Sequence, residues 1–166
     1  TGLRRQKSSD RYQFTQVMKS SLVKLIATGC YTGYLPKAPG TAGSALAILI
    51  LWVIGPVEPL YYLVATGLLI LVGIWAANQA ELEFGHDAGP IVIDEIIGIF
   101  IACALLPITP LILGLGFVLF RILDIAKPFP INKSQSLPGG LGVVADDVLA
   151  AVYAHVILRA IIIFVL

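Results

Sequence analysis

Three charged residues recur at every third position near the end of an apolar stretch: Arg121, Asp124 and Lys127. On a helix this spacing places them on one face, so that they meet at its C-terminal end. Pro128 then ends the helix. A further pair, Asp146 and Asp147, follows a loop with three glycines and opens the next apolar stretch. Because carboxylates beside apolar sequence need a cationic partner, we predict that residues 117–147 form the centre of an active site.

A second acidic pair, Asp94 and Glu95, lies at the start of another apolar stretch. Burying two carboxylates near a membrane is unfavourable unless a partner compensates for the lost water, and a divalent cation would do so. Because adjacent helical residues point about 100° apart, we expect one acid to bind the ion directly and the other to act through water or a hydrogen bond. The alternative is an exposed pair that caps the helix.

The acids of both groups are the residues that we predict to be catalytic and metal-binding: Asp94, Glu95, Asp124, Asp146 and Asp147. Carboxylate oxygens without a nearby set of histidines or cysteines favour Mg²⁺ or Ca²⁺ over zinc. Cations beside such a metal, here Arg121, Lys127 and Lys133, neutralise charge that develops on phosphoryl oxygens. The pattern therefore predicts chemistry on a phosphate ester. Salt bridges within a bundle would explain Arg121 and Asp124, but not five acids at one face.

A segment rich in glycine and proline, residues 36–44, precedes the first long apolar stretch. Thr41 is a suitable N-cap, small residues let a ligand approach the backbone, and unpaired amides at a helix start attract phosphate. This segment and the cations above supply the predicted substrate-binding residues: Lys37, Gly40, Thr41, Gly43, Ser44, Arg121 and Lys127. Taken alone, such a segment is more often a plain connector than an anion site.

The composition is that of an integral membrane protein. Of the 166 residues, 58% are hydrophobic and 13% are charged, against about 25% charged in a soluble domain, and the mean hydropathy is +0.92. Residues 1–24 contain six basic residues and one acid, which marks the N-terminal end as cytoplasmic. We expect a basic tail over residues 1–20 and one helical domain over residues 21–166. Nothing in the sequence predicts a nucleic-acid or protein partner.

Hydropathy and helix-breaking residues predict an all-α fold, a membrane-embedded bundle of about five apolar helices plus a short N-terminal helix, with the active-site loops on one face. The short helix is expected over residues 21–28, and the others over residues 42–55, 60–83, 91–106, 110–126 and 144–165. Five passes would place the turns 55–59 and 107–110 on the far side, and the loops 29–41, 84–91 and 127–143 on the near side. Spanning requires about 20 residues, so the shorter helices could instead form a bundle that is only partly embedded.

Four groups of residues, in order along residues 27–151, resemble the phosphatidylglycerophosphatase A family of bacterial lipid phosphatases. They are Gly29, Gly33, Pro36, Pro39–Thr41 and Gly43–Ser44; Asp87, Ile91–Val92, Asp94–Glu95 and Gly98; Phe120–Arg121, Asp124, Lys127–Pro128 and Pro130–Ile131; and Gly139–Gly140, Gly142 and Asp146–Asp147. The resemblance implies an all-α fold around a central helix. It also implies Mg²⁺-dependent hydrolysis of phosphatidylglycerophosphate to phosphatidylglycerol and phosphate, for phospholipid biosynthesis, at the cytoplasmic face of the bacterial inner membrane. Tyr31 and Ala151 replace glycines common in the family, which bears on substrate preference rather than on activity.

Other phosphatase chemistries do not fit the sequence. It has no D-x-D-x-[TV] motif of phosphoaspartate enzymes, and neither cysteine is followed by arginine six positions later, as in thiol phosphatases. A metal-assisted mechanism remains, with water or an aspartate as the nucleophile, and we favour water.

Two other functions fit the sequence less well. A Mg²⁺-dependent phosphatidyl transferase would carry a D-x-x-D-G-x-x-A-R motif, which is missing. A small ion-coupled transporter would carry its acids near the membrane midplane, whereas these acids lie at predicted helix ends.

Overall fold

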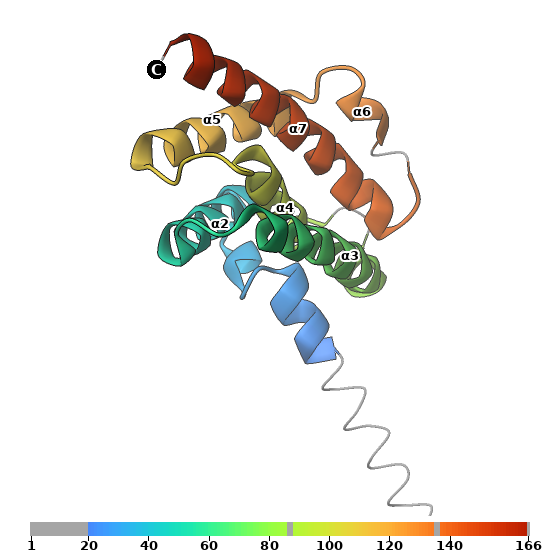
Figure 1. Ribbon diagram of the computed structural model, residues 1–166. Coiled ribbons are helices and arrows are strands. Elements are labelled where there is room, and N and C mark those ends of the chain that lie inside the picture. The colour runs from blue at the N-terminus through green and yellow to red at the C-terminus, as the bar shows by residue number, and fades with distance from the viewer. Residues whose placement is uncertain (1–19, 86–87, 135–136, 166) are drawn as a thin grey trace, which may run out of the picture.

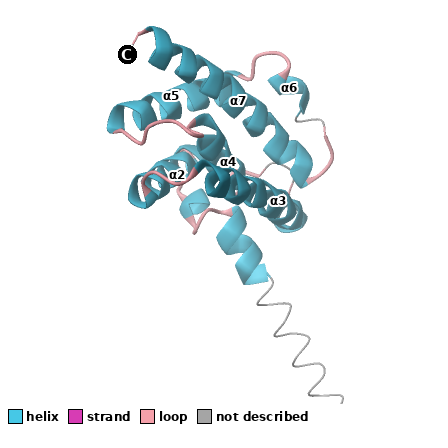
Figure 2. Cartoon of the chain, viewed as in Figure 1, coloured by secondary structure: helices cyan, strands magenta, loops and turns pink. Residues whose placement is uncertain are grey.

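The computed structural model describes residues 20–85, 88–134 and 137–165. Within these ranges the chain consists of helices and loops, as predicted, and contains no strand (Figures 1 and 2). Residues 20–27 are helical, and the elements that follow are η1 (Thr32–Tyr34), α2 (Pro39–Ile54), α3 (Pro59–Phe84), α4 (Ile93–Ala102), α5 (Pro110–Ala126), α6 (Ile131–Ser134) and α7 (Gly140–Phe164). The predicted basic tail, apart from Ser20, lies outside the described residues, and so does Asp87.

The short helix α4 is the centre of the bundle. It contacts α2, α3, α5 and α7, and Figure 1 shows it between these longer helices. Ile97 and Ile99 in its middle are fully buried. Apart from its acidic first turn, α4 is apolar around its whole circumference, as expected for a helix with protein on every side.

Glycines let neighbouring helices approach this centre closely. A side chain at Gly98 of α4 would collide with the ring of Phe120 in α5. A Cβ atom at Gly43 of α2 would lie 2.8 Å from Cβ of Val92, just before α4, whereas carbon atoms normally pack about 3.5–4.0 Å apart. These contacts exclude any larger residue and so fix how α2 and α5 lie against α4.

Two helices begin earlier than predicted. α2 begins at Pro39 instead of residue 42, because proline suits the first helical position, where no amide hydrogen is needed. α7 begins at Gly140 instead of residue 144. Gly140 packs against the backbone of α3, and its amide donates to Oδ1 of Asn78 at 3.3 Å. Asp146 and Asp147 therefore lie two turns inside α7 and do not open it.

The prediction of one helix over residues 91–106 was wrong at both ends. The amide of Val92 donates to the carbonyl of Ala27 at 2.8 Å instead of entering a helix. After Ala102 the chain turns, and Leu105 takes a left-handed conformation (φ 54°). All these residues are apolar, and apolarity alone does not distinguish a buried turn from a buried helix. The predicted loop 127–143 also contains the short helix α6, which was not predicted.

Two helices, α3 and α7, are long and apolar enough to cross a membrane. Only 28% of the most apolar window of each is buried, so most of their surface faces outward, unlike the core helix of a soluble protein. The 10 residues of α4 extend about 15 Å at 1.5 Å per residue, which is too short for a hydrocarbon core about 30 Å thick. The count of five membrane passes is therefore wrong for α4.

The grouping of the loops agrees with the prediction where the structure describes them. The two turns predicted to share one side line one cavity of about 280 Å³, which includes Pro56, Val57, Leu106 and Pro107. Near the other end of α4, residues 29–33 pack against residues 90–92. The acidic first turn of α4 thus lies at the end opposite to the two short turns.

We expect that replacing Gly98 by alanine destabilises the fold by about 1–3 kcal/mol, because the added methyl group meets the fully buried ring of Phe120. Gly67→Ala in α3 is the matched control, since no atom lies within 4 Å of its Cβ position, and it should be neutral or stabilising by up to about 1 kcal/mol. Thermal unfolding in detergent, followed by circular dichroism, measures both. Equal midpoints for the two variants would contradict this account of the α4–α5 contact.

Candidate active site

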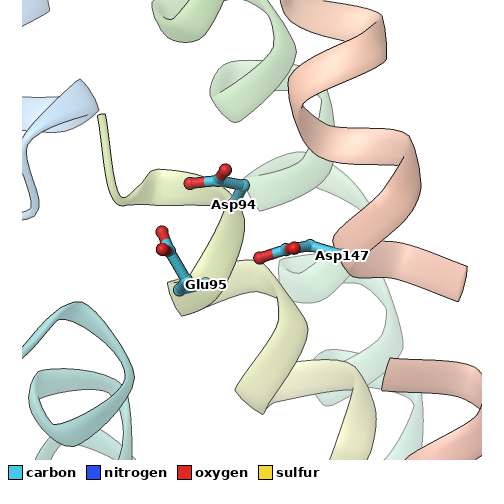
Figure 3. Close-up of side chains that lie close together, drawn as sticks. All are labelled: Asp94, Glu95 and Asp147. Atoms are coloured by element: carbon cyan, nitrogen blue, oxygen red, sulfur yellow. The ribbon is translucent and has the colours of Figure 1, made fainter. Parts of the chain in front are cut away.

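Three carboxylates converge between α4 and α7. Asp94 and Glu95 extend from the first turn of α4, and Asp147 extends from α7, toward a common space (Figure 3). One carboxylate oxygen of each residue lies within 4.8 Å of the other two. We expect from the sequence that only one acid of the α4 pair binds a metal directly. In the structure both acids reach this space, so the geometry allows either or both to bind. We call these three residues the acid cluster.

Two acids of the cluster are buried and Glu95 is partly buried, and the charge of the cluster is incompletely compensated. Asp94 is 7% exposed and Asp147 is 3% exposed. Oδ1 of Asp94, Oε2 of Glu95 and Oδ2 of Asp147 have no hydrogen-bond partner among the described residues. Burial, reinforced by repulsion from Glu95 and Asp147, raises the pKa of Asp94 well above its usual range, and burial also raises the pKa of Glu95. A nearby cation would favour the ionised form of all three groups, and carboxylate oxygens suit a hard divalent ion such as Mg²⁺.

Arg121 links the acid cluster to α5. Its Nη1 donates to Oδ2 of Asp124 at 2.7 Å and lies 3.7 Å from Oε1 of Glu95. Its Nε is buried and has no acceptor among the described residues. Asp124 is itself buried and interacts electrostatically with Glu95 and Asp147. The predicted proximity of Arg121 and Asp124 is confirmed, and Asp124 is a fourth acid beside the cluster.

The fifth predicted acid, Asp146, pairs with Lys127, whose Nζ donates to Oδ2 at 2.6 Å. Lys127 caps the C-terminus of α5 in a left-handed conformation (φ 41°). Burial by itself lowers the pKa of Lys127, but the hydrogen bond to Asp146 and the charges of Asp124 and Asp147 outweigh this effect and raise the pKa. Lys127 is therefore a stable positive charge close to the acids.

The N-terminus of α2 reaches the acid cluster at Gly40. A side chain at Gly40 would collide with the carboxylate of Glu95, and its Cβ would lie 3.1 Å from Nη1 of Arg121. Glycine thus allows both charged groups to pack against a helix start, where unpaired amides carry partial positive charge. The prediction that Thr41 is the N-cap was wrong. That position belongs to Ala38, in a left-handed conformation (φ 50°), because the helix starts at the proline that follows it.

The other predicted residues of this segment lie in different surroundings. Gly43 packs against Val92 in the contact between α2 and α4. Ser44 is fully buried, and its Oγ donates to the carbonyl of Gly40 at 2.9 Å. Lys37 is exposed in the loop before α2. Gly43 and Ser44 therefore have packing roles, and substrate binding by them and by Lys37 stays a prediction.

Sequence reasoning missed Asn78, which helps to position Asp147. Its side-chain oxygen accepts the amide of Gly140, which fixes the start of the helix that carries Asp147. The available signal was a pair of adjacent amide side chains, Asn78 and Gln79, near the end of the mostly apolar stretch 60–80. Such a residue needs a hydrogen-bond partner when it lies in a helix contact.

The comparisons with known proteins agree with the motifs. The chain matches the model of the family described as phosphatidylglycerophosphatase A over residues 25–162. It is 38% identical over 146 residues to "Phosphatidylglycerophosphatase A" of Haemophilus influenzae, covering 84% of this chain and 88% of the relative. It is 40% identical over 139 residues to the Escherichia coli protein of the same name, covering 81% and 80%.

A protein of Bacteroides thetaiotaomicron named "Putative phosphatidylinositol-3-phosphatase" is 39% identical over 147 residues, covering 84% of this chain and 92% of the relative. No solved structure matches the chain. The family match spans the acid cluster, Arg121 and Lys127 together with all the helices that position them, from α2 to most of α7. The chain therefore belongs to the phosphatidylglycerophosphatase A family of phosphatases.

Proposed function

We propose that this protein is a Mg²⁺-dependent lipid phosphatase that hydrolyses phosphatidylglycerophosphate to phosphatidylglycerol and inorganic phosphate. The observation that carries the proposal is the acid cluster, in which one buried oxygen of each carboxylate lacks a hydrogen-bond partner among the described residues and Glu95 lies beside the guanidinium of Arg121. Membership of the family and the names of two relatives support the choice of substrate.

The acid cluster would hold the metal ion. When bound, Mg²⁺ supplies positive charge that neutralises the carboxylates and stabilises charge on the phosphoryl oxygens. Asp124 and Asp146 are also candidate ligands, and their ion pairs with Arg121 and Lys127 hold these cations beside the cluster. We assign the catalytic and metal-binding roles to all five acids on this basis.

Arg121 is the best placed of the predicted phosphate-binding residues. Its Nη1 is occupied by Asp124, whereas its buried Nε has no acceptor among the described residues and is available for a phosphoryl oxygen. Lys127 and the start of α2 at Gly40 add positive charge nearby. Charge-assisted hydrogen bonds of this kind contribute about 1.5–3 kcal/mol each, enough to select a phosphomonoester dianion.

We further propose that α3 and α7 cross the bacterial inner membrane and that the site faces the cytoplasm. The outward-facing apolar surface of both helices supports this placement. Asp147 lies two turns from the start of α7, which suits the depth of lipid headgroups. Residues 1–20 would then form a basic tail near anionic lipids, attached to a single helical domain over residues 21–166.

Phosphatidylinositol 3-phosphate is a second candidate substrate. The relative from Bacteroides thetaiotaomicron carries that lipid in its name and is as similar to this chain as the other two. Both lipids present a phosphomonoester at the membrane surface, so the acid cluster suits either. The two differ in the group that carries the phosphate, glycerol in one and the bulkier inositol ring in the other.

We expect the purified protein in detergent to release phosphate from phosphatidylglycerophosphate with a kcat/KM at least about tenfold above that for phosphatidylinositol 3-phosphate. The reason is steric, because Glu95 and Arg121 already pack against Gly40 and the inositol ring is bulkier than glycerol. Release of inorganic phosphate at equal mole fractions of the two lipids measures the ratio. The reverse order would identify the second candidate as the substrate.

Removal of the metal, or of one cluster carboxylate, should abolish turnover. EDTA should stop phosphate release and Mg²⁺ should restore it. Asp94→Asn and Asp147→Asn should each lower kcat more than about a hundredfold, because each residue contributes one carboxylate oxygen to the cluster that would hold the metal. Glu58→Gln, at the start of α3, is the control and should stay active. In EDTA the two Asn variants should melt at or above the wild-type temperature, because they remove buried repulsion. Full activity of either variant would refute the assignment.

The proposed orientation predicts that residues at opposite ends of the bundle label from opposite sides. In a background without Cys30 and Cys103, Asn132→Cys in α6 and Val57→Cys before α3 are both exposed positions. In sealed inverted vesicles an impermeant maleimide should label position 132 directly, and position 57 only after detergent is added. Labelling of both without detergent would instead place the whole bundle on the cytoplasmic leaflet.

A further inference from the structure

An apolar groove lies between α2 and α5, two helices that contact each other beside α4 (Figure 1). It encloses about 270 Å³ and is lined by Ile48 and Trp52 of α2 and by Pro110, Leu113 and Gly114 of α5. Trp52 is 50% exposed. No atom lies within 4 Å of the position that a Cβ at Gly114 would take. The groove is therefore open space that the protein's own side chains do not fill.

Both walls of the groove lead to the acid cluster. One helical face of α2 carries residues at spacings of four, three and four: Thr41, Ala45, Ile48 and Trp52. One face of α5 carries the same spacing: Pro110, Gly114, Phe117 and Arg121. Residues so spaced lie in one row along a helix. The rows converge at the site, where the start of α2 at Gly40 packs against Nη1 of Arg121.

The distance between groove and site fits one kind of ligand. Ile48 follows Gly40 by eight residues and Gly114 precedes Arg121 by seven, so the near end of the groove lies about 10–12 Å from the phosphate-binding groups at 1.5 Å per residue. The lining carries no charged side chain. A ligand that fills both places is therefore anionic at one end and hydrocarbon at the other, with a short polar connection between them.

The cavity beside the two short turns is a poorer candidate. Its lining comes from the turns at 55–59 and 103–108, beyond the end of α4 opposite to Asp94 and Glu95. Apart from these turns its lining includes Tyr62 of α3, and none of its lining residues belongs to α5, the helix that carries Arg121. It therefore offers no path for a molecule whose phosphate lies at the acid cluster.

We infer that the groove between α2 and α5 binds an acyl chain of the lipid substrate and so positions the phosphomonoester at Arg121 and the acid cluster. This inference rests on the proposed lipid phosphatase activity and adds to it a subsite that recognises the hydrocarbon. The glycerol backbone of the lipid spans the distance between chain and phosphate. A substrate without long chains loses this positioning but keeps the contacts of its phosphate.

Filling the groove tests the inference. Gly114→Phe places a ring in the open space, and Gly67→Phe in α3, which has equally open surroundings but does not line the groove, is the matched control. With dipalmitoyl phosphatidylglycerophosphate, Gly114→Phe should lower kcat/KM about tenfold, because a misplaced reacting group reacts slowly. With the dibutyryl lipid it should match the wild type. Gly67→Phe should match the wild type on both substrates.

A binding measurement keeps the test valid if Gly114→Phe folds poorly. The chain has two tryptophans, so Trp75→Phe leaves Trp52 in the groove as the only reporter. In the inactive Asp147→Asn background, phosphatidylglycerophosphate with brominated acyl chains should quench Trp52 fluorescence with saturation at a low mole fraction. Brominated phosphatidylcholine at the same mole fraction should not. Equal quenching by both lipids would overturn the inference, because the groove would then hold any bilayer lipid.

Two further outcomes separate the inference from the function on which it rests. If the wild type releases phosphate from the long-chain lipid and Gly114→Phe does so equally well, the groove proposal is wrong and the phosphatase proposal stands. A second outcome is that Gly114→Phe loses activity equally on both chain lengths and changes the oligomeric state in size-exclusion chromatography. The groove would then bind a second copy of the chain, which also overturns the proposal. If the wild type releases phosphate from neither lipid, the proposed function itself fails.

Discussion

The structure depends on the burial of carboxylates at one end of an apolar bundle. Three of them form the acid cluster: Asp94, Glu95 and Asp147. Loss of water disfavours their ionisation, and their mutual repulsion adds to this effect. Arg121 and Lys127 offset part of the negative charge, but their short ion pairs of 2.7 and 2.6 Å are made to Asp124 and Asp146. The negative charge of the acid cluster is therefore only partly offset, so the same feature that opposes folding without a metal ion would favour the binding of one.

Such a cluster forms only if the helices that carry it approach one another closely. Gly98 lets α5, with Arg121 and Asp124, pack directly on α4. Gly40 lets the start of α2 meet Glu95, and Gly140 lets α7 cross the backbone of α3. In each case a side chain at the glycine would separate the elements. Gly40, Gly98 and Gly140 thus allow the helices that carry the charged groups to pack closely. Of these three glycines, only Gly40 lies next to the charged groups themselves.

Local spacing predicted part of this site, and long-range packing decided the rest. The i, i+3 relation between Arg121 and Asp124 appears in the structure as an ion pair, because it depends on one helix alone. The pairing of Lys127 with Asp146 joins residues 19 apart, and it depends on the left-handed turn at Lys127 and on the path of α6. The early start of α7 depends on Asn78 and on contact with α3. Hydropathy carries no information about such contacts. The order of the helices and the bounds of α5 were therefore predicted, whereas the start of α7 and both ends of α4 were not.

The shortness of α4 bears on which substrates can reach the acids. If α3 and α7 span the bilayer, the 10-residue helix α4 between them cannot reach both surfaces. The turn that follows α4 must then be enclosed by protein, because unpaired backbone groups are not tolerated in lipid. The turn after Ala102 meets this requirement, since Cys103 and Leu106 are buried. The acidic end of α4 is likewise almost closed to solvent, with Asp94 7% exposed. A phosphomonoester that enters so enclosed a site must leave most of its water behind. A lipid, whose acyl chains already hold it at the membrane, meets that requirement more readily than a soluble phosphate ester of the same charge.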